Sequence, residues 1–147
     1  MAIILLVSGP NLNLLGTREP HIYGSDTLDD CVGDARAAAE ALGHTLEHVQ
    51  SNHEGELVDA IQGARDRCGA IVINPGAYTH SSYAIADALA AFEGVKVELH
   101  LSNPASREEW RRRSVVGPYV TGTVAGFGRA GYRLAVEAAA GRLDGDA

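Results

Sequence analysis

Short aliphatic runs alternate along the chain with alanine-rich segments that carry apolar residues at helical spacing. Residues 2–8 form a continuous aliphatic run that ends at Gly9 and Pro10, as expected for a parallel strand covered on both faces. Residues 95–101 (VKVELHL) alternate with the period of two that is typical of strands. The pattern predicts strands over residues 2–8, 44–50, 70–74, 95–101 and 119–125.

The segments between these strands carry helix signals. Asp26 or Thr27 is suited to cap a helix that continues to Leu42, and Gly43 is placed to end it in the left-handed conformation. The remaining helices are predicted over residues 52–68, from Ser81 or Ser82 to about residue 94, over 106–113 (short and polar), and over 131–141.

This alternation of strands and helices defines the fold class. It implies right-handed crossovers and a parallel sheet with helices on both faces. We therefore predict an α/β protein, a flavodoxin-like three-layer α/β/α sandwich with a five-stranded parallel sheet, as one domain over residues 1–147. Because the connection over residues 9–25 is longer than βα loops usually are, residues 16–25 are predicted to form a mobile lid. Residues 142–147 are expected to be a disordered tail.

Charge and composition exclude several functions. The formal net charge of −7 disfavours nucleic acid and anionic membranes as partners. The apolar run near the start lacks a preceding basic segment and is too short to span a bilayer, so we expect a cytoplasmic protein. Cys31 and Cys68 make neither a disulfide framework nor a zinc site, and the six histidines form no known metal motif, so no metal is expected.

Polar residues gather where the predicted strands end. Asn11 follows the first strand, Asn74 and His80 follow the third, and His100 and Ser102 end the fourth. In open α/β sheets, ligands bind beyond the carboxyl ends of the strands. The sequence therefore predicts a ligand site at this edge.

Two pairs of residues suggest acid–base chemistry. Glu98 and His100 lie two apart on a strand, so both point to the same face, where the carboxylate can fix the tautomer or charge of the imidazole; an unrelated exposed pair is the alternative. In the long loop, a guanidinium from Arg18 close to the phenol of Tyr23 would lower the phenol's pKa. A loop tyrosine more often has a structural role, so spacing leaves both interpretations open.

A long motif separates these alternatives. The string GPNLNLLGTREPHIYG at residues 9–24 resembles the signature of type II 3-dehydroquinate dehydratases, and it contains both Arg18 and Tyr23. Further similar stretches follow in the family's order: QSNHEGELVDAI at 50–61, NPGAYTHSS at 74–82, VELHLSN at 97–103 and REEWRRRS at 107–114. The resemblance covers nearly all of residues 2–140.

The resemblance implies a reaction and its catalytic residues. Enzymes of this family are hydro-lyases that convert 3-dehydroquinate reversibly to 3-dehydroshikimate in the shikimate pathway, through an enolate and without cofactor, metal or Schiff base. By this resemblance, the Tyr23 phenolate removes the proton beside the ketone, Arg18 favours the ionised phenol, and Asn11 stabilises the enolate. His100 then protonates the departing hydroxyl, and Glu98 orients its imidazole.

The remaining matches imply substrate binding and oligomerisation. Family members assemble as trimers that form a dodecamer, and one acidic residue reaches the ligand of a neighbouring subunit. The residues so implied are Asn74, His80 and Arg111 at the substrate hydroxyls, Leu101, Ser102 and the Asn74 side chain at its carboxylate, and Asp87 from the neighbouring subunit.

Three departures from the family pattern concern lid packing, affinity and assembly. Residues 104–106 (PAS) replace a stretch that usually contains a histidine, residues 113–115 (RSV) stand where HSY is common, and Tyr83 replaces a smaller residue. None of them removes a proposed catalytic group. A paralogue that acts on a related cyclic acid therefore stays an alternative.

The second class of function is a noncatalytic flavodoxin-like module that binds a nucleotide or a partner. The absence of a phosphate loop near the first predicted strand counts against it. Gly126, Gly128 and Gly131 match GxGxxG, but too few residues follow for a dinucleotide-binding unit, so these glycines are predicted to allow tight packing of a helix on a strand.

Overall fold

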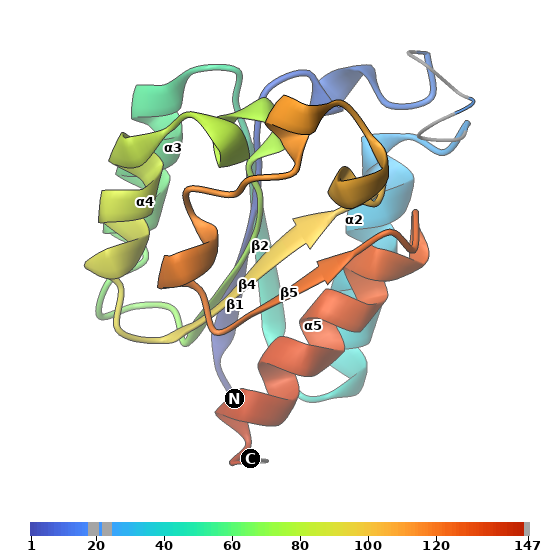
Figure 1. The fold of residues 1–147 in the computed structure, drawn as a ribbon. Helices are drawn as coiled ribbons and strands as arrows, with labels where there is room; N and C mark the ends of the chain where they lie inside the picture. Colours follow the sequence, from blue (N-terminus) through green and yellow to red (C-terminus); the bar gives the residue numbers. More distant parts are fainter. Residues whose placement is uncertain (18–20, 22–24, 146–147) are drawn as a thin grey trace.

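Five parallel strands form one sheet in the computed structural model, which describes residues 1–17, 21 and 25–145 (Figure 1). Their spatial order is β2-β1-β3-β4-β5, and every neighbouring pair is parallel. This order is the flavodoxin-like one, and the predicted fold class is confirmed. The strands are β1 (Ile3–Ser8), β2 (Thr45–Gln50), β3 (Ala70–Asn74), β4 (Val95–His100) and β5 (Gly122–Ala125).

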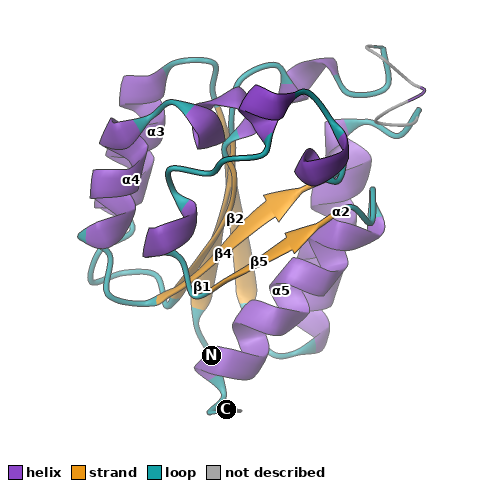
Figure 2. Ribbon diagram, viewed as in Figure 1, coloured by secondary structure: helices purple, strands orange, loops and turns teal. Residues whose placement is uncertain are grey.

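Helices cover both faces of the sheet (Figure 2). α2 and α5 lie side by side on one face, and α3 and α4 lie on the other. None of the described helices is both long and apolar enough to cross a membrane. The helices are α2 (Leu28–Ala41), α3 (Glu54–Gly63), α4 (Tyr83–Ala90) and α5 (Ala130–Leu143).

The strand β1 shows how the sequence produces these layers. Ile4 and Leu6 belong to the apolar cluster beneath α2 and α5, whereas Leu5 and Val7 belong to the cluster beneath α3 and α4. Successive side chains of a strand point to opposite faces of the sheet. A continuous aliphatic run is therefore what a strand between two helical layers requires.

Side chains at the helix starts explain where α2 and α4 begin. The hydroxyl of Thr27 accepts a hydrogen bond from the Asp30 N–H at 3.2 Å, and the Asp30 carboxylate accepts one from the Thr27 N–H at 3.0 Å. At the start of α4, Ser82 Oγ accepts from the Ile85 N–H at 3.0 Å. Of the two cap residues predicted for each helix, the second forms the cap, which is Thr27 for α2 and Ser82 for α4.

The carboxyl end of α4 is tied to the sheet by a lysine from β4. Lys96 Nζ donates to the carbonyl oxygens of Leu89 at 2.9 Å and Phe92 at 2.6 Å. Carbonyl groups at a helix end lack partners within the helix, and the helix dipole favours a cation there. Burial lowers the pKa of Lys96 from its ordinary value.

The segment after β4 differs from the prediction. Instead of one polar helix over residues 106–113, two 3₁₀ turns form, η3 (Pro104–Ser106) and η4 (Glu109–Arg111), with extended backbone at Arg107 between them. The Asn103 side chain accepts from the N–H of Ala105 at 3.1 Å and so stabilises the first turn. This local bonding competes with a continuous helix.

Other boundaries shift as well. The helix predicted to reach residue 68 ends at Gly63, and the chain turns through a left-handed residue, Asp66, with φ 61°. The last strand begins at Gly122 because Gly117–Tyr119 form a proline-containing 3₁₀ turn, η5. The last helix continues to Leu143, which packs on the cluster beneath α2 and α5, so the expected disorder cannot begin at residue 142.

Candidate active site

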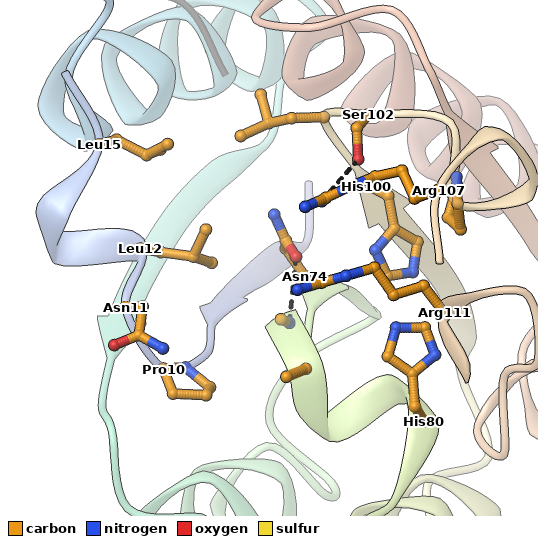
Figure 3. Close-up of a pocket in the computed structure, with 14 residues that line it drawn as sticks. Pro10, Asn11, Leu12, Leu15, Asn74, His80, His100, Ser102, Arg107 and Arg111 are labelled. Carbon is orange, nitrogen blue, oxygen red and sulfur yellow. Dashed lines mark hydrogen bonds between the residues drawn. The ribbon is translucent and has the colours of Figure 1, made fainter. Parts of the chain in front are cut away.

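A pocket opens at the carboxyl edge of the sheet, beyond the ends of β1, β3 and β4 (Figure 3). Its open space, with the solvent at its mouth included, is about 720 Å³. Leu12 and Leu15 give one side an apolar surface, and Leu101 contributes to the wall. The polar side chains that line it are Asn11, Asn74, His80, His100, Ser102, Arg107 and Arg111.

Close backbone contacts bring the loops after β1 and β3 together here. A Cβ atom on Gly9 would lie 2.4 Å from the carbonyl oxygen of Pro75, so only glycine fits without moving the backbone. The Gly9 N–H donates to the Asn74 carbonyl at 2.8 Å. Asn11 follows in the left-handed conformation, φ 70°, and its N–H donates to Oδ1 of Asn52 at 3.0 Å. These contacts hold Asn11 at the pocket wall.

The predicted pair of Glu98 and His100 is present. His100 Nε2 lies 2.6 Å from Oε2 of Glu98, and the imidazole lines the pocket while the carboxylate lies behind it, 1% exposed. An ionised carboxylate only accepts, so the proton of this bond belongs to Nε2. Nδ1 makes no hydrogen bond to any residue that the structure describes and is the ring nitrogen left for a ligand.

Two hydroxyl groups that the sequence analysis did not identify complete the surroundings of Glu98. Thr79 Oγ1 donates to Oε2 at 2.8 Å, and Ser114 Oγ lies 3.0 and 3.1 Å from Oε1 and Oε2. Burial by itself raises the pKa of Glu98, but the hydrogen bonds from His100, Thr79 and Ser114 outweigh it, and the pKa lies below its ordinary value. Glu98 is therefore an anion at neutral pH.

A corner of the pocket presents hydrogen-bond donors. Asn74 is only 3% exposed. Its Oδ1 accepts from the Gly76 N–H at 3.2 Å, and its Nδ2 donates to the Tyr132 hydroxyl at 3.4 Å. One Nδ2 hydrogen is therefore left for a ligand. The backbone N–H groups of Leu101 and Ser102 donate to none of the described residues. N–H groups that are available in one pocket suit an anion such as a carboxylate.

His80 and Arg111 form another wall, where both contact Trp110. Nδ1 of His80 donates to the carbonyl of Arg113 at 2.7 Å, so Nε2 of the neutral ring is left as an acceptor. The His80 and Trp110 rings meet edge to face at 5.2 Å, and the guanidinium carbon of Arg111 lies 4.1 Å from the indole centroid. Glu108 accepts from Nε of Arg111 at 2.5 Å. These contacts restrict both side chains to the pocket wall (Figure 3).

Arg107 also lines the pocket, although sequence reasoning gave it no role there. Its Nη1 donates to Oγ of Ser102 at 3.4 Å, and its side chain points into the pocket close to His100 (Figure 3). The extended backbone that interrupts the predicted helix is what places Arg107 at the rim. With Arg111 it gives the pocket two guanidinium groups, which favour an anionic ligand even in an acidic chain.

Of the predicted site residues that the structure describes, Asp87 lies away from this pocket and from the residues directly behind it. Asp87 is exposed on α4 and lines a separate shallow depression together with Tyr83 and Tyr119. Its contact with the ligand of a neighbouring subunit stays a prediction. Arg18 and Tyr23 lie outside the described residues, as does most of the lid predicted over residues 16–25.

The glycine motif near the carboxyl terminus serves packing. A Cβ atom on Gly131 would lie 3.1 Å from Cδ1 of Leu99, and Gly126 and Gly128 have positive φ angles of 95° and 58°. The first turn of α5 therefore packs closely against β4, in agreement with the packing role predicted for this motif. Within the described ranges, no three His, Cys, Asp or Glu side chains are grouped to hold a metal ion.

The pocket joins an imidazole–carboxylate pair to a corner of N–H donors and two guanidinium groups. The pair can donate or accept a proton in a fixed direction, and the donors can hold a carboxylate close to it. This fold and this site define a class of α/β protein whose pocket is suited to acid–base chemistry on a small anionic ligand.

Comparison with known proteins identifies the family. The family model for dehydroquinase class II matches residues 2–140. A 3-dehydroquinate dehydratase from Phenylobacterium zucineum is 59% identical over 138 residues, 94% of this chain and 95% of the relative. A catabolic 3-dehydroquinase from Aspergillus clavatus is 58% identical over 134 residues, 91% and 89% of the two chains. The crystal structure of a type II dehydroquinase from Butyrivibrio crossotus, 43% identical, matches with a TM-score of 0.91 over 97% of both chains. The chain belongs to the class II dehydroquinase family, as its motifs predict, and is a hydro-lyase.

Proposed function

We propose that this chain catalyses the reversible dehydration of 3-dehydroquinate to 3-dehydroshikimate in the pocket at the carboxyl edge of the sheet. The observation that carries the proposal is the buried Glu98 carboxylate bonded to His100, with the imidazole facing a cavity that Arg107 and Arg111 also line. Such a pair supplies an oriented proton donor, and the guanidinium groups favour a carboxylated substrate. The names of the relatives support this choice of substrate.

The substrate's carboxylate binds at the corner of N–H donors, which are the backbone amides of Leu101 and Ser102 and the side chain of Asn74. The hydroxyl groups of the substrate bond to His80 and Arg111. Asn74 also bonds to a substrate hydroxyl. The available Nε2 of His80 and the restricted guanidinium of Arg111 support these assignments. The apolar side of the pocket packs against the ring carbons.

The chemistry consists of proton transfers and one bond cleavage. Tyr23, ionised beside Arg18, removes the proton next to the ketone, and the electrons of that C–H bond form an enolate whose oxygen Asn11 stabilises. The enolate then returns its electrons, the bond to the β-hydroxyl breaks, and His100 gives its proton so that water leaves. Glu98 holds the imidazole during this transfer. No electrons pass to an acceptor, so acid–base catalysis needs neither metal nor cofactor.

Assembly and location complete the proposal. The chain acts as a homo-oligomer built from trimers, in a dodecamer as its family resemblance implies, and Asp87 reaches the pocket of a neighbouring subunit. Exposure of Asp87 on α4, away from the pocket of its own chain, supports this arrangement. The enzyme works in the cytoplasm.

We place the reaction in the shikimate pathway, where it leads towards aromatic amino acids. The name catabolic 3-dehydroquinase, carried by the fungal relatives, favours catabolic use of the same reaction as a second candidate. Deleting the gene discriminates between the two. A requirement for added aromatic amino acids supports the biosynthetic role, whereas loss of growth only on carbon sources degraded through 3-dehydroquinate supports the catabolic one.

The activity is tested with purified protein and 3-dehydroquinate alone. Formation of the conjugated enone is followed by its near-ultraviolet absorbance, with and without a metal chelator, and the rate is expected to be the same in both. His100→Ala should reduce turnover by about 10²- to 10⁴-fold, the usual contribution of a general acid. His53→Ala, which removes an exposed histidine elsewhere, is the matched control and should retain the wild-type rate.

An unchanged spectrum with the folded wild-type protein would refute the proposal. Heat stabilisation by a flavin or a nucleotide, without any turnover, would favour a noncatalytic binding module instead. Turnover of a related ring acid but not of 3-dehydroquinate would identify a paralogue with a different substrate.

A further inference from the structure

Glu98 is surrounded by more hydrogen-bond donors than the orientation of one histidine requires. We propose that Thr79 and Ser114 are positioning residues that hold the Glu98 carboxylate in one orientation and so determine which ring nitrogen His100 offers to the substrate. Both hydroxyls contact the carboxylate, and His100 lies between it and the pocket. The inference rests on the proposed dehydratase activity and goes beyond it.

The hydrogen bonds of Ser114 fix the direction of its hydroxyl. Its oxygen accepts from the Gly117 N–H at 2.8 Å, and it lies 3.0 and 3.1 Å from the two oxygens of Glu98. The hydroxyl has a single proton, and an ionised carboxylate cannot donate, so that proton is directed at Glu98. Ser114 thereby contacts both carboxylate oxygens and opposes rotation of the group.

Thr79 acts on the oxygen that also binds the histidine. Its hydroxyl lies 2.8 Å from Oε2 of Glu98 but 3.4 Å from Nε2 of His100, so its proton belongs to the carboxylate. The main chain keeps Thr79 in place, because its carbonyl oxygen accepts from the Val115 N–H at 2.7 Å. That bond also joins the segments that carry the two hydroxyls.

These contacts have a consequence for catalysis. With Oε1 and Oε2 both occupied by donors, the carboxylate stays ionised and Nε2 of His100 keeps its proton throughout turnover. Nδ1 is then the nitrogen that loses a proton to the leaving hydroxyl and regains one afterwards. Without the hydroxyls, the carboxylate can rotate or take up a proton, and the imidazole loses its fixed direction.

The test removes each hydroxyl with little change of shape. Thr79→Val and Ser114→Ala should each lower kcat about tenfold, the effect of one hydrogen bond to a charged group, with KM within about threefold of the wild type. Thr79→Ser keeps the hydroxyl and should restore kcat to within about twofold, because the donor to the carboxylate remains. Thr123→Val, at an exposed position of β5, is the matched control and should leave kcat unchanged.

A double-mutant cycle with Glu98→Gln separates positioning from a general loss of structure. If the hydroxyls act through the carboxylate, Thr79→Val and Ser114→Ala should cost little additional kcat in the Glu98→Gln background. Full additivity, or a wild-type kcat in both folded single variants, would overturn the inference while leaving the dehydratase activity intact. A wild-type protein that does not turn over 3-dehydroquinate overturns the proposed function instead. If Thr79→Val does not fold, Ser114→Ala alone decides the question.

Discussion

Replacing Glu98 by glutamine tests the acid–base pair with the smallest change of shape. The amide has nearly the size of the carboxylate, so the packing behind His100 is expected to survive. The amide oxygen can still accept from Nε2, but it carries no charge to stabilise the imidazolium ring that we propose as the proton donor. The NH₂ group then takes the place of Oε1 and faces the hydroxyl of Ser114, which now donates to that oxygen.

The size of the effect follows from the environment of Glu98. The residue is 1% exposed and its bond to His100 measures 2.6 Å, so water does not screen or replace the lost charge. A hydrogen bond to a charged group contributes about 1.5–3 kcal/mol, and 1.36 kcal/mol corresponds to about a tenfold change in rate. Glu98→Gln should therefore lower kcat by roughly 10- to 150-fold, less than removal of the proton donor itself.

Initial rates of enone formation over a range of 3-dehydroquinate concentrations give kcat and KM separately. KM should change little, because Glu98 lies behind His100 and does not line the pocket. Glu93→Gln, at an exposed position, is the matched control for loss of one negative charge. A folded Glu98→Gln protein with the wild-type kcat, or one in which only KM rises, would show that the pair does not take part in proton transfer.

Three further predictions concern stability. Lys96→Met should lower the free energy of unfolding in urea by about 2 kcal/mol, because the Phe92 carbonyl loses its donor and the Leu89 carbonyl keeps only backbone N–H groups; Arg65→Met, at an exposed site, should change it little. Gly9→Ala should destabilise the protein by about 1–3 kcal/mol or more, because the added Cβ meets the Pro75 backbone. Gly33→Ala should stabilise it by about 0.5–1 kcal/mol, because Gly33 is exposed within α2 and has open space for a Cβ. Equal melting temperatures of the two variants would contradict this contrast. Because the pKa of Glu98 is depressed in the folded state, its ionised form stabilises the fold above the ordinary glutamate pKa of about 4.3, and this contribution is lost as the pH falls through the folded-state value. The melting temperature of the wild type relative to Glu98→Gln should therefore fall between pH 7 and pH 3, and a constant difference would contradict the assignment.

Local signals were sufficient to predict the sheet. Residues 70–74 form β3 with the predicted bounds because an aliphatic run lies between Gly69 and Pro75, which favour turns. The helix predicted over residues 106–113 was wrong, although the charges of this segment are compatible with a helix. The side-chain cap from Asn103 and the extended backbone at Arg107 decide the structure instead. Tertiary contacts and local hydrogen bonds of this kind have no periodicity that a sequence displays.

The same contrast holds within the site. The pair of Glu98 and His100 could be predicted because positions two apart on a strand share a face. Thr79 and Ser114 could not, because they are 19 and 16 residues from Glu98 in sequence and reach it only through the fold. The role of Arg107 at the rim likewise depends on the interruption of a helix that the sequence favours.

The departure at residues 113–115 lies where the pocket wall is built largely by the main chain. The carbonyl of Arg113 accepts from His80 at 2.7 Å, and the N–H of Val115 donates to the carbonyl of Thr79 at 2.7 Å. Neither bond depends on the identity of the side chain. Ser114, between them, bonds to both oxygens of Glu98 through its side chain, and it is the residue that this chain shares with the common HSY pattern.

The side chains that do differ face another part of the molecule. Arg113 and Val115 line the shallow depression near Asp87, and Tyr83, another departure, lines it as well; Val115 also packs in the apolar cluster beneath α3 and α4. Asp87, the residue proposed to reach a neighbouring subunit, lies in the same depression. Two of the three departures therefore border the depression that also holds Asp87, whereas Pro104 of the third lines the pocket itself.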